Sequence, residues 1–407
     1  MEDLHRIAES IWKWAKDRDF KGYDPYDGLN SRLLAPLLKH SRFLRLATIQ
    51  AVKRCPFNPR KLLLISPGLN PKGLALFLSG ISYMPELDTE NTAERLQQMI
   101  LSLASKPDGT PAFSTVRTIR NDISVEELEE SELFAWGYNF PWQSKAFFQP
   151  AWFPTVVCSS FVLDAFKQCR SSFYPAVAIN LAKFTAETLN IHKDDSGICF
   201  SYSPNDNSRV FNASLFAAKI LTRAIEFDEN NADLYSSLAT RACDYVVSRQ
   251  SRDGSWVYGE ADHWQWVDNL HTGFVLETLN SIVSMLSTDK YDDSIARGLN
   301  YYTDNLFEKD WTAKYFSSSK YPLDPHSTAQ GAITYMELNR FNDNAPQITK
   351  NILHIGIADL WDIKRQGFIF QKYPSHMKRM IYLRWSQGWM FKALSFFYHR
   401  DNTGGQV

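Results

Sequence analysis

The chain has 407 residues, of which 44% are hydrophobic and 22% charged, and its formal net charge is −1. A single simple core does not usually reach this length, so we expect several domains or one large repetitive architecture. The near-neutral charge argues against a nucleic-acid-binding protein, and short basic clusters such as Arg42–Arg45 and Lys378–Arg379 are interpreted as solvated helix ends. Five scattered cysteines without a CxxC pair argue against a disulfide framework.

Membrane insertion and export are not indicated by the sequence. The longest apolar stretch, LALFLSGISYM at 74–84, is too short to cross a bilayer. The N-terminal residues form a charged amphipathic pattern that differs from a signal peptide. We therefore expect a soluble cytoplasmic protein without a transmembrane segment.

Apolar residues recur every three or four positions along most of the chain, which predicts many helices and few strands. Fourteen helices would make seven hairpins, and we place them at residues 3–18, 29–40, 42–55, 71–83, 90–105, 153–170, 172–190, 211–226, 231–250, 269–286, 290–307, 326–339, 345–361 and 384–400. The segment at about 106–152 is poor in helix but rich in aromatic residues. We interpret it as a long ordered loop inserted into a single domain that spans 1–407.

The later loops repeat one plan. Those at 195–214, 252–273 and 365–388 share a small residue or Gly that is followed by alternating aromatic residues, and 310–331 follows the same plan without the leading Gly. Helical hairpins of this kind bury their apolar faces only when they stack side by side. We therefore predict an all-α toroid of six or seven helical hairpins, with long loops and short strands at one mouth. An open solenoid is the alternative.

Two resemblances support the toroid. The turn YVVSRQSRDGSW at 245–256 resembles the Gln-x-x-Asp-Gly-x-Trp repeat of terpene cyclases and protein prenyltransferases, which are α/α toroids. Pieces from almost the whole chain resemble a bacterial family encoded with capsular, exopolysaccharide and O-antigen biosynthesis genes: YDPYDGLNSRL, LNPKGLALFLSG, WGYNFPWQS, FPTVVCSSFVLDA, DNLHTGFVLETL and RWSQGWMFKAL. This second resemblance implies a role in making a bacterial polysaccharide.

The candidate catalytic residues precede or begin successive inner helices of the predicted toroid. They are Asp262, His263, Asp268, His271, Asp324 and His326. Successive hairpins are neighbours in space, so we expect these groups to meet at one rim, where helix N-termini favour anionic ligands. Histidine titrates near neutral pH and carboxylates can be tuned towards it, so such a cluster can move protons.

The candidate substrate-binding residues combine flat rings with polar groups. Rings offer faces on which sugars stack, while amide, carboxylate and guanidinium groups bond hydroxyls and acids. The set comprises Tyr23, Asp27, Trp142, Gln143, Arg209, Asn212, Trp264, Trp266, Asn269, Gln330, Arg384 and Trp385.

Several of these residues also have a purely structural interpretation. Asn212, Asn269 and Asp324 can act as N-caps, and Arg384 can form a structural salt bridge. Trp256 is expected in the hairpin core, and Trp385 with Trp389 can form a core stripe. Because no HExxH pattern or tight ligand spacing is present, we expect no metal and no cofactor.

Three functions stay open on this basis. The first is a carbohydrate-active enzyme with lyase, epimerase or hydrolase chemistry on an oligosaccharide or polysaccharide, acidic or lipid-linked. The second is a non-catalytic glycan-binding partner of polysaccharide-assembly proteins. The third is a terpene cyclase or prenyltransferase-like enzyme, which would need a dry aromatic cavity and acidic magnesium ligands.

Overall fold

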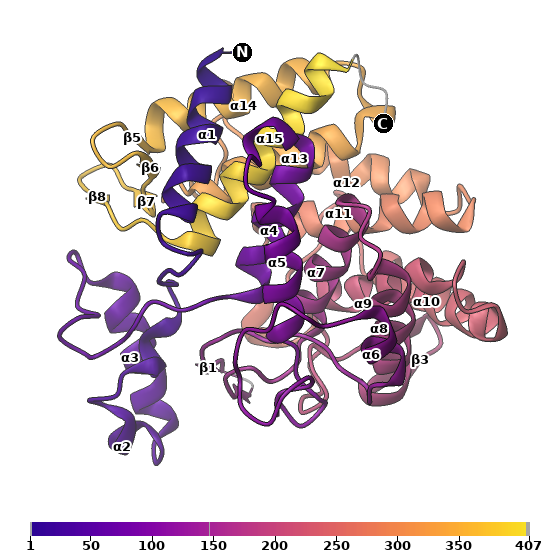
Figure 1. The fold of residues 1–407 in the computed structure, drawn as a ribbon. Helices are drawn as coiled ribbons and strands as arrows, with labels where there is room; N and C mark the ends of the chain where they lie inside the picture. Colours follow the sequence, from indigo (N-terminus) through magenta and orange to yellow (C-terminus); the bar gives the residue numbers. More distant parts are fainter. Residues whose placement is uncertain (1, 146, 404–407) are drawn as a thin grey trace.

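Helices make up most of the computed structural model, which describes residues 2–145 and 147–403 (Figure 1). Six inner helices pack one against the next, and the last of them returns to the first, so they close a ring. These are α4 (Pro71–Tyr83), α7 (Val156–Gln168), α9 (Phe211–Ala224), α11 (Asn269–Leu286), α13 (Pro325–Glu337) and α15 (Trp389–Asn402). They are buried on nearly all sides, as helices without a polar face must be.

Six outer helices surround this ring. They are α1 (Glu2–Lys16), α5 (Thr92–Ser102), α8 (Tyr174–Thr188), α10 (Ala232–Ser248), α12 (Asp292–Asn305) and α14 (Ala345–Leu360). Their sequences are amphipathic, so one face packs on the inner ring and the other meets solvent. The predicted α/α toroid is confirmed, with six hairpins in the described part of the chain.

The predicted helix at 29–40 is wrong, and with it the seventh hairpin. Pro36 cannot lie inside a helix that begins at residue 29, and the segment breaks into a 3₁₀ turn (Asp27–Asn30) and the short α2 (Ala35–Leu38). Together with α3 (Arg42–Arg54) they form a lobe that stands away from the ring at the lower left of Figure 1. This lobe, residues 27–64, has its own small core of Leu29, Leu38 and Ile49.

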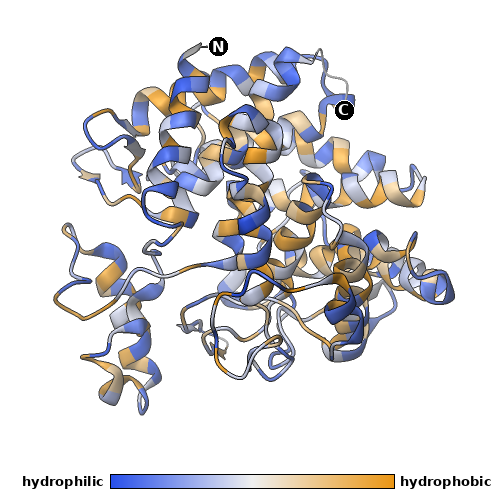
Figure 2. Cartoon of the chain, viewed as in Figure 1, coloured by the Kyte–Doolittle hydropathy of each residue, from blue (hydrophilic) through white to orange (hydrophobic). Residues whose placement is uncertain are grey.

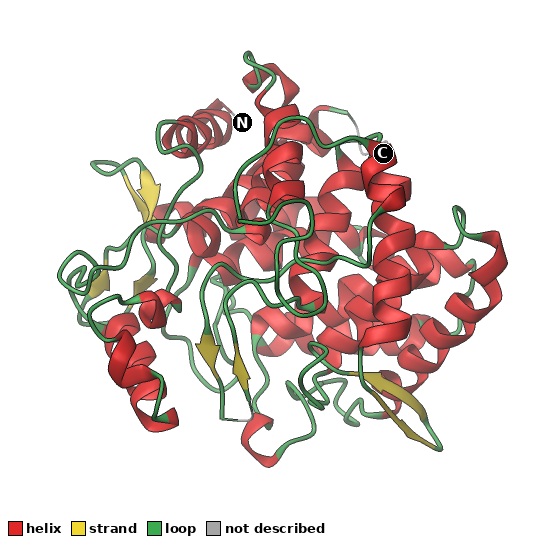
Figure 3. Ribbon diagram, turned by 60° about the horizontal axis from the view of Figure 1, so that its bottom comes forward, coloured by secondary structure: helices red, strands yellow, loops and turns green. Residues whose placement is uncertain are grey.

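Long loops occupy one end of the ring. Every connection from an outer to an inner helix is long, whereas every connection from an inner to an outer helix is a short turn. The long loops carry α6 (Val125–Glu130) and four antiparallel strand pairs: β1–β2 (Trp142–Gln143, Phe148–Gln149), β3–β4 (Ile191–Asp194, Gly197–Phe200), β5–β6 (Trp361–Asp362, Gly367–Phe368) and β7–β8 (Gln371–Lys372, Met377–Lys378). Figure 3 shows these pairs among the loops and apart from the helices. All six inner helices therefore begin at this mouth.

The Gln-x-x-Asp-Gly-x-Trp turn shows how hairpins are joined. Trp256 is buried and its indole N–H donates to the Val246 carbonyl at 2.9 Å, which confirms its predicted place in the core. Gly254 has a φ of +93°, and an added Cβ would lie 2.4 Å from the Arg297 carbonyl oxygen on the next hairpin. Only glycine allows this close approach.

Across the part of the chain that the structure describes, none of the helices combines the length and the apolar character needed to cross a bilayer.

Candidate active site

The first turns of the inner helices bring their side chains to the ring axis at the mouth. Side-chain caps hold four of these starts: Asn70 on α4, Thr155 on α7, Asp268 on α11 and Asp324 on α13. The predicted cap role of Asp324 is confirmed. Those of Asn212 and Asn269 are wrong, because both residues lie inside their helices.

His271 on α11 forms a pair with Asp268. Its Nδ1 lies 2.7 Å from the Asp268 Oδ2, and Asp268 also accepts the backbone N–H of His271 at 2.8 Å. The same carboxylate accepts the Trp266 indole N–H at 3.0 Å. An ionised carboxylate can only accept hydrogen bonds, so the imidazole proton is on Nδ1. When the imidazole is neutral, its Nε2 carries the lone pair that a general base requires.

An aromatic platform adjoins this pair. The rings of Tyr258 and Trp266 stack with centroids 5.0 Å apart and an interplanar angle of 11°. Tyr258 also meets the His271 ring at 4.4 Å. Trp266 is 36% exposed and the His271 side chain 30% exposed, so both can be reached from solvent. A flat ring surface beside a general base is suited to holding a sugar ring.

His326 on α13 is buried, and neither of its ring nitrogens has a partner among the described residues. Its ring stacks on Trp389 at 4.2 Å and meets the edge of Trp385 at 4.8 Å. Burial lowers the pKa of His326 well below its usual value, and the nearby charges of Lys72 and Arg384 lower it further. The imidazole is therefore neutral at pH 7. Two unpartnered nitrogens in a buried place are unfavourable without a ligand.

Lys72 on α4 is a site residue that sequence reasoning missed. It is buried, with its ammonium 3.8 Å from the centre of the Phe161 ring and 5.2 Å from that of Trp389. Burial lowers the pKa of Lys72 well below its usual value, and the positive charge of Arg384 adds to this effect. The sequence did hold a signal. Lys72 follows a cap and a proline, just as His326 follows Asp324 and Pro325.

Phe274 links these groups. Its ring centroid lies 6.1 Å from that of His271 and 6.2 Å from that of His326, and the Lys72 ammonium is 5.4 Å from it. The Asp-oriented imidazole, the neutral imidazole and the lysine therefore surround one ring at the axis of the toroid.

Arg384 enters the same place from the π-helical turn (Leu383–Gly388) before α15. Its guanidinium forms a buried ion pair with Asp24, with an N–O distance of 2.7 Å. The expected salt bridge is thus present, and its cation also lies 5.1 Å from the Tyr138 ring. The pair joins residues near the two ends of the chain.

Asp324 supports the site through its hydrogen bonds. It accepts the Trp385 indole N–H at 3.0 Å and the Gln371 side-chain N–H at 3.0 Å. Burial raises the pKa of Asp324 to about 6. These bonds fix the Trp385 ring against His326, so Asp324 is a positioning residue in this geometry.

Other predicted residues lie at the outer rim. Asp262 and His263 are exposed on a 3₁₀ turn (Asp262–Trp264), away from the axis cluster. Arg209 pairs with Glu260 at 2.9 Å and, together with Trp264, lines a separate cavity of about 430 Å³. Trp264 nevertheless approaches the axis cluster, because its ring lies 5.7 Å from that of Tyr258, which contacts His271.

A third group lies at the base of the lobe. Asp27 is buried and accepts two bonds from the Arg60 guanidinium at 2.8 and 3.0 Å, while burial raises the pKa of its carboxyl to about 6. Gln143 accepts from Arg45 at 2.9 Å. Trp142 packs against the lobe core, and Tyr23 lies beside Arg60.

Three predicted amides lie in the ring wall. Asn269 accepts the Tyr302 hydroxyl at 2.8 Å, and Gln330 donates to Glu277 and to Thr334. Asn212 is buried with its side-chain oxygen unpartnered. Among the residues described, no group of three His, Cys, Asp or Glu side chains is arranged to hold a metal ion.

Comparison with known proteins gives the fold. No protein-family model matches the chain, and no curated protein matches it in sequence. Among solved structures, cellobiose 2-epimerase from Bacillus thermoamylovorans B4167 is similar with a TM-score of 0.57 and 9% identity, over 81% of this chain and 88% of that one.

Two further structures are similar. A GH76 α-mannanase of Bacteroides thetaiotaomicron gives a TM-score of 0.55 and 12% identity over 82% of this chain and 88% of that one. An unsaturated glucuronyl hydrolase specific for heparin gives 0.54 and 10% identity over 84% and 90%. The chain therefore has the α/α toroid fold that these carbohydrate-active enzymes share.

Proposed function

We propose that this chain is a sugar epimerase or isomerase that moves a proton at the carbon next to a carbonyl group. One observation carries the proposal. At the axis of the toroid, the Asp268-oriented His271 faces the Phe274 ring, and on that same ring lies the neutral His326 with both nitrogens unpartnered. An imidazole oriented by a carboxylate and a second, neutral imidazole near the same ring are suited to taking up and returning a proton.

The proton steps follow from these states. The His271 Nε2 accepts the proton of the carbon next to the carbonyl, and the electron pair of that C–H bond forms the double bond of an enediolate. The cations Lys72 and Arg384 stabilise the negative oxygen. The ring N–H of His326 gives a proton to the opposite face of the same carbon, which inverts it, or to the neighbouring carbon, which isomerises the sugar. His326 then takes up a proton from solvent while the His271 imidazolium releases one to solvent, so that both imidazoles become neutral again.

The acidic residues at the mouth argue against a two-carboxylate hydrolase. Such an enzyme needs one carboxyl group as acid and a second as base or nucleophile. Here Asp24 is bound by Arg384, Asp27 by Arg60 and Asp268 by His271 and Trp266. Asp324 is bound by Trp385 and Gln371. Each of these four carboxylates is engaged by donors, which favours histidine as the proton carrier.

The substrate we propose is a mono- or oligosaccharide with a free carbonyl at its reducing end. The platform of Tyr258 and Trp266 beside His271 supports a sugar ring as the group that is held. A cellobiose 2-epimerase is among the enzymes that share the α/α toroid fold, which is compatible with such a substrate. The sequence resemblance to a family encoded with capsular and exopolysaccharide genes supports a role in supplying sugars for a bacterial polysaccharide.

The test is solvent exchange. The protein is incubated in D₂O with a panel of aldoses, ketoses and reducing disaccharides, and deuterium at the carbon next to the carbonyl is followed by NMR. We expect exchange in the wild type, its loss in His271→Gln, and normal exchange in His263→Gln, a matched change of a histidine at the exposed rim.

Other outcomes would contradict the proposal. New reducing ends released from glycans without deuterium exchange would identify a hydrolase. Sugar binding without exchange would favour a glycan-binding protein.

A further inference from the structure

The lobe of residues 27–64 has an unusual charge pattern. No Asp or Glu occurs between Asp27 and Glu86, whereas residues 31–64 contain eight Lys or Arg. The one acidic side chain at its base, Asp27, is neutralised by the buried Arg60. The lobe therefore carries positive charge only, although the whole chain is near neutral.

The lobe also exposes many apolar side chains. Of the fourteen large hydrophobic residues that are exposed among those described, seven lie here: Leu33, Leu37, Phe43, Leu44, Phe57, Leu62 and Leu64. Phe43 is 76% exposed and Leu62 is 73% exposed. Figure 2 shows orange segments along this lobe. Single exposed apolar residues are ordinary on a protein, but such a concentration marks an interaction surface.

These side chains do not hold the lobe together. Its interior is formed by Leu29, Leu38 and Ile49, and its base is anchored by the Asp27–Arg60 pair. The exposed leucines and phenylalanines do not belong to that core. Because the lobe does not need them in order to fold, their exposure indicates another role.

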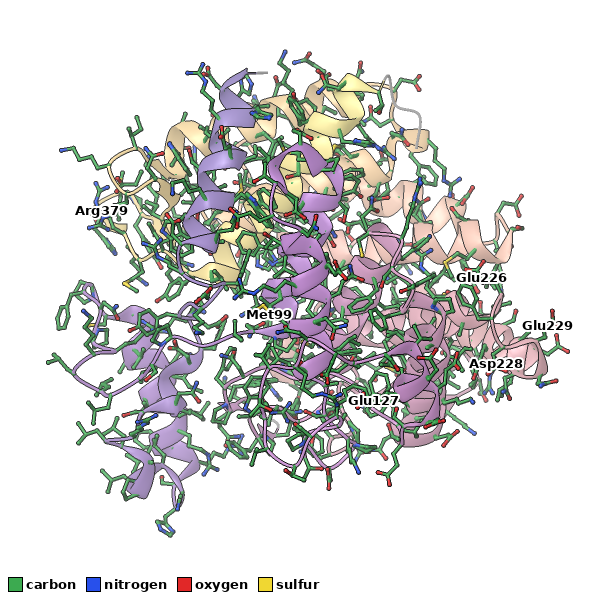
Figure 4. The ribbon with its side chains drawn as sticks, in the orientation of Figure 1. Met99, Glu127, Glu226, Asp228, Glu229 and Arg379 are labelled. Carbon is green, nitrogen blue, oxygen red and sulfur yellow. The ribbon has the colours of Figure 1, made fainter. Side chains whose placement is uncertain are left out.

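Exposed cations alternate with these apolar side chains along the lobe sequence. Arg32, Lys39, Arg42, Arg54 and Lys61 are all exposed. The cationic surface continues onto the β7–β8 hairpin, where the pKa of Lys378 is lowered first by burial and then by the charges of Lys53 and Arg54. In Figure 4, Arg379 lies on this side of the molecule, whereas Glu226, Asp228 and Glu229 lie at the opposite edge.

We propose that this lobe binds the surface of an anionic lipid membrane. The apolar side chains, led by Phe43 and Leu62, enter the headgroup region, and the surrounding cations contact lipid phosphates. A protein partner would usually be matched by charges of both signs. Positive charge alone around protruding apolar side chains instead matches a uniformly negative surface above an apolar interior.

The lobe adjoins the mouth of the toroid. The Lys53 ammonium lies 4.4 Å from the Tyr26 ring and 6.0 Å from the Trp385 ring, which itself contacts His326. A membrane-bound molecule therefore holds its active-site mouth close to the lipid surface. This inference rests on the lobe alone and does not require the proposed chemistry.

Vesicle sedimentation tests it. The full chain is mixed with vesicles of phosphatidylcholine and phosphatidylglycerol, and separately with vesicles of phosphatidylcholine alone. We expect binding to the anionic vesicles only, and weaker binding as salt rises. Removing one cation, as in Arg42→Gln, should weaken binding about five-fold. Phe43→Ser should weaken it about ten-fold.

Matched controls lie on the other side of the molecule in Figure 1. Leu234→Ser on α10 removes a half-exposed leucine, and Lys193→Gln on β3 removes an exposed lysine. Both should bind like the wild type, and circular dichroism checks that every variant is folded. Absence of sedimentation with anionic vesicles at low salt would overturn the proposal. A dimer in ultracentrifugation that Phe43→Ser dissociates would overturn it in favour of a protein interface.

Discussion

The two ends of the toroid are built from the same six inner helices, but basic side chains lie at opposite ends of the helix dipoles in the two regions. At the mouth, Lys72 and His326 lie in the second helical position, where the positive end of the helix dipole disfavours a cation. Aromatic rings surround both side chains, and within the described part of the chain neither forms an ion pair with a carboxylate. At the far end, Lys167, Arg223 and Arg400 lie in last turns, where the dipole favours them.

The far end also contains a buried ion pair. A cavity of about 250 Å³ there is lined by both signs. Lys219 donates to Asp164 at 2.5 Å, and Glu277 accepts the Thr334 hydroxyl at 2.5 Å. The far end is therefore arranged for stability, whereas the mouth keeps groups that are unfavourable until a ligand binds. Buried polar groups without partners are the reason that we propose the mouth, and not the far end, as the reactive site.

The largest expected effect is at the mouth. Asp268→Asn keeps an N-cap for α11 but no longer holds the proton on the His271 Nδ1. We expect the rate of deuterium exchange into the sugar to fall by about 10²- to 10⁴-fold, with little change in the free energy of unfolding. A variant that keeps the wild-type rate would show that the mouth is no more reactive than the far end.

The next effect is on stability at the far end. Lys219→Met leaves the Asp164 carboxylate without its cation, and we expect the free energy of unfolding to fall by about 3 kcal/mol. Urea denaturation measures the loss. Replacing Asp164 with Leu in the same chain should restore most of it. Exchange activity per folded molecule should stay unchanged, because neither residue touches the mouth.

A smaller effect on the free energy of unfolding depends on pH. Burial raises the pKa of Glu277 to about 8, so the folded state binds a proton that the unfolded state releases near pH 4.5. The contribution of Glu277 to stability is therefore complete at low pH and is lost as pH rises through 8. Asp27 and Asp324 act in the same direction with pKa values of about 6.

Glu277→Gln isolates this contribution. Between about pH 5 and about pH 9 the wild type should lose about 2 kcal/mol more than the variant in urea unfolding, because the side chain borders a cavity and only part of the full linkage is expressed. Equal pH dependence in the two proteins would show that the far-end carboxyl is already ionised.

The smallest expected effect is a change in stability at the mouth. Lys72→Met keeps the length of the side chain and removes an unpaired ammonium from an aromatic environment. We expect the free energy of unfolding to rise by about 1 kcal/mol while exchange activity falls. Urea midpoints and exchange rates measured on the same samples test both halves. A drop in stability would mean that the contacts of Lys72 with the rings favour the folded state.

Much of the fold could be predicted because helical periodicity and loop repeats are local patterns. The ring of hairpins and the loop-rich mouth both follow from them. The number of hairpins could not be derived in the same way. The segment 29–40 has apolar spacing, and only the tertiary packing shows that Pro36 and the small separate core exclude it from the ring.

The candidate site was found in part. His271, His326 and Arg384 do meet at the axis, because inner helices start at one mouth. His263 was placed with them since a 3₁₀ turn gives no periodicity from which a direction can be read. Lys72 was missed because a lysine near a helix start usually faces water, and its burial depends on Phe161 and Trp389 from other hairpins.

The closure of the ring by α15 has a consequence for biosynthesis. A chain that leaves the ribosome from its N-terminus has completed five inner helices before α15 exists, and until then the apolar flanks of α4 and α13 have no neighbour. Arg384 then meets Asp24, which lies 360 positions earlier in the chain. The residue cluster at the mouth is thus complete only after α15 has been made, and a chain that stops before α15 is an open arc that chaperones or proteases can recognise.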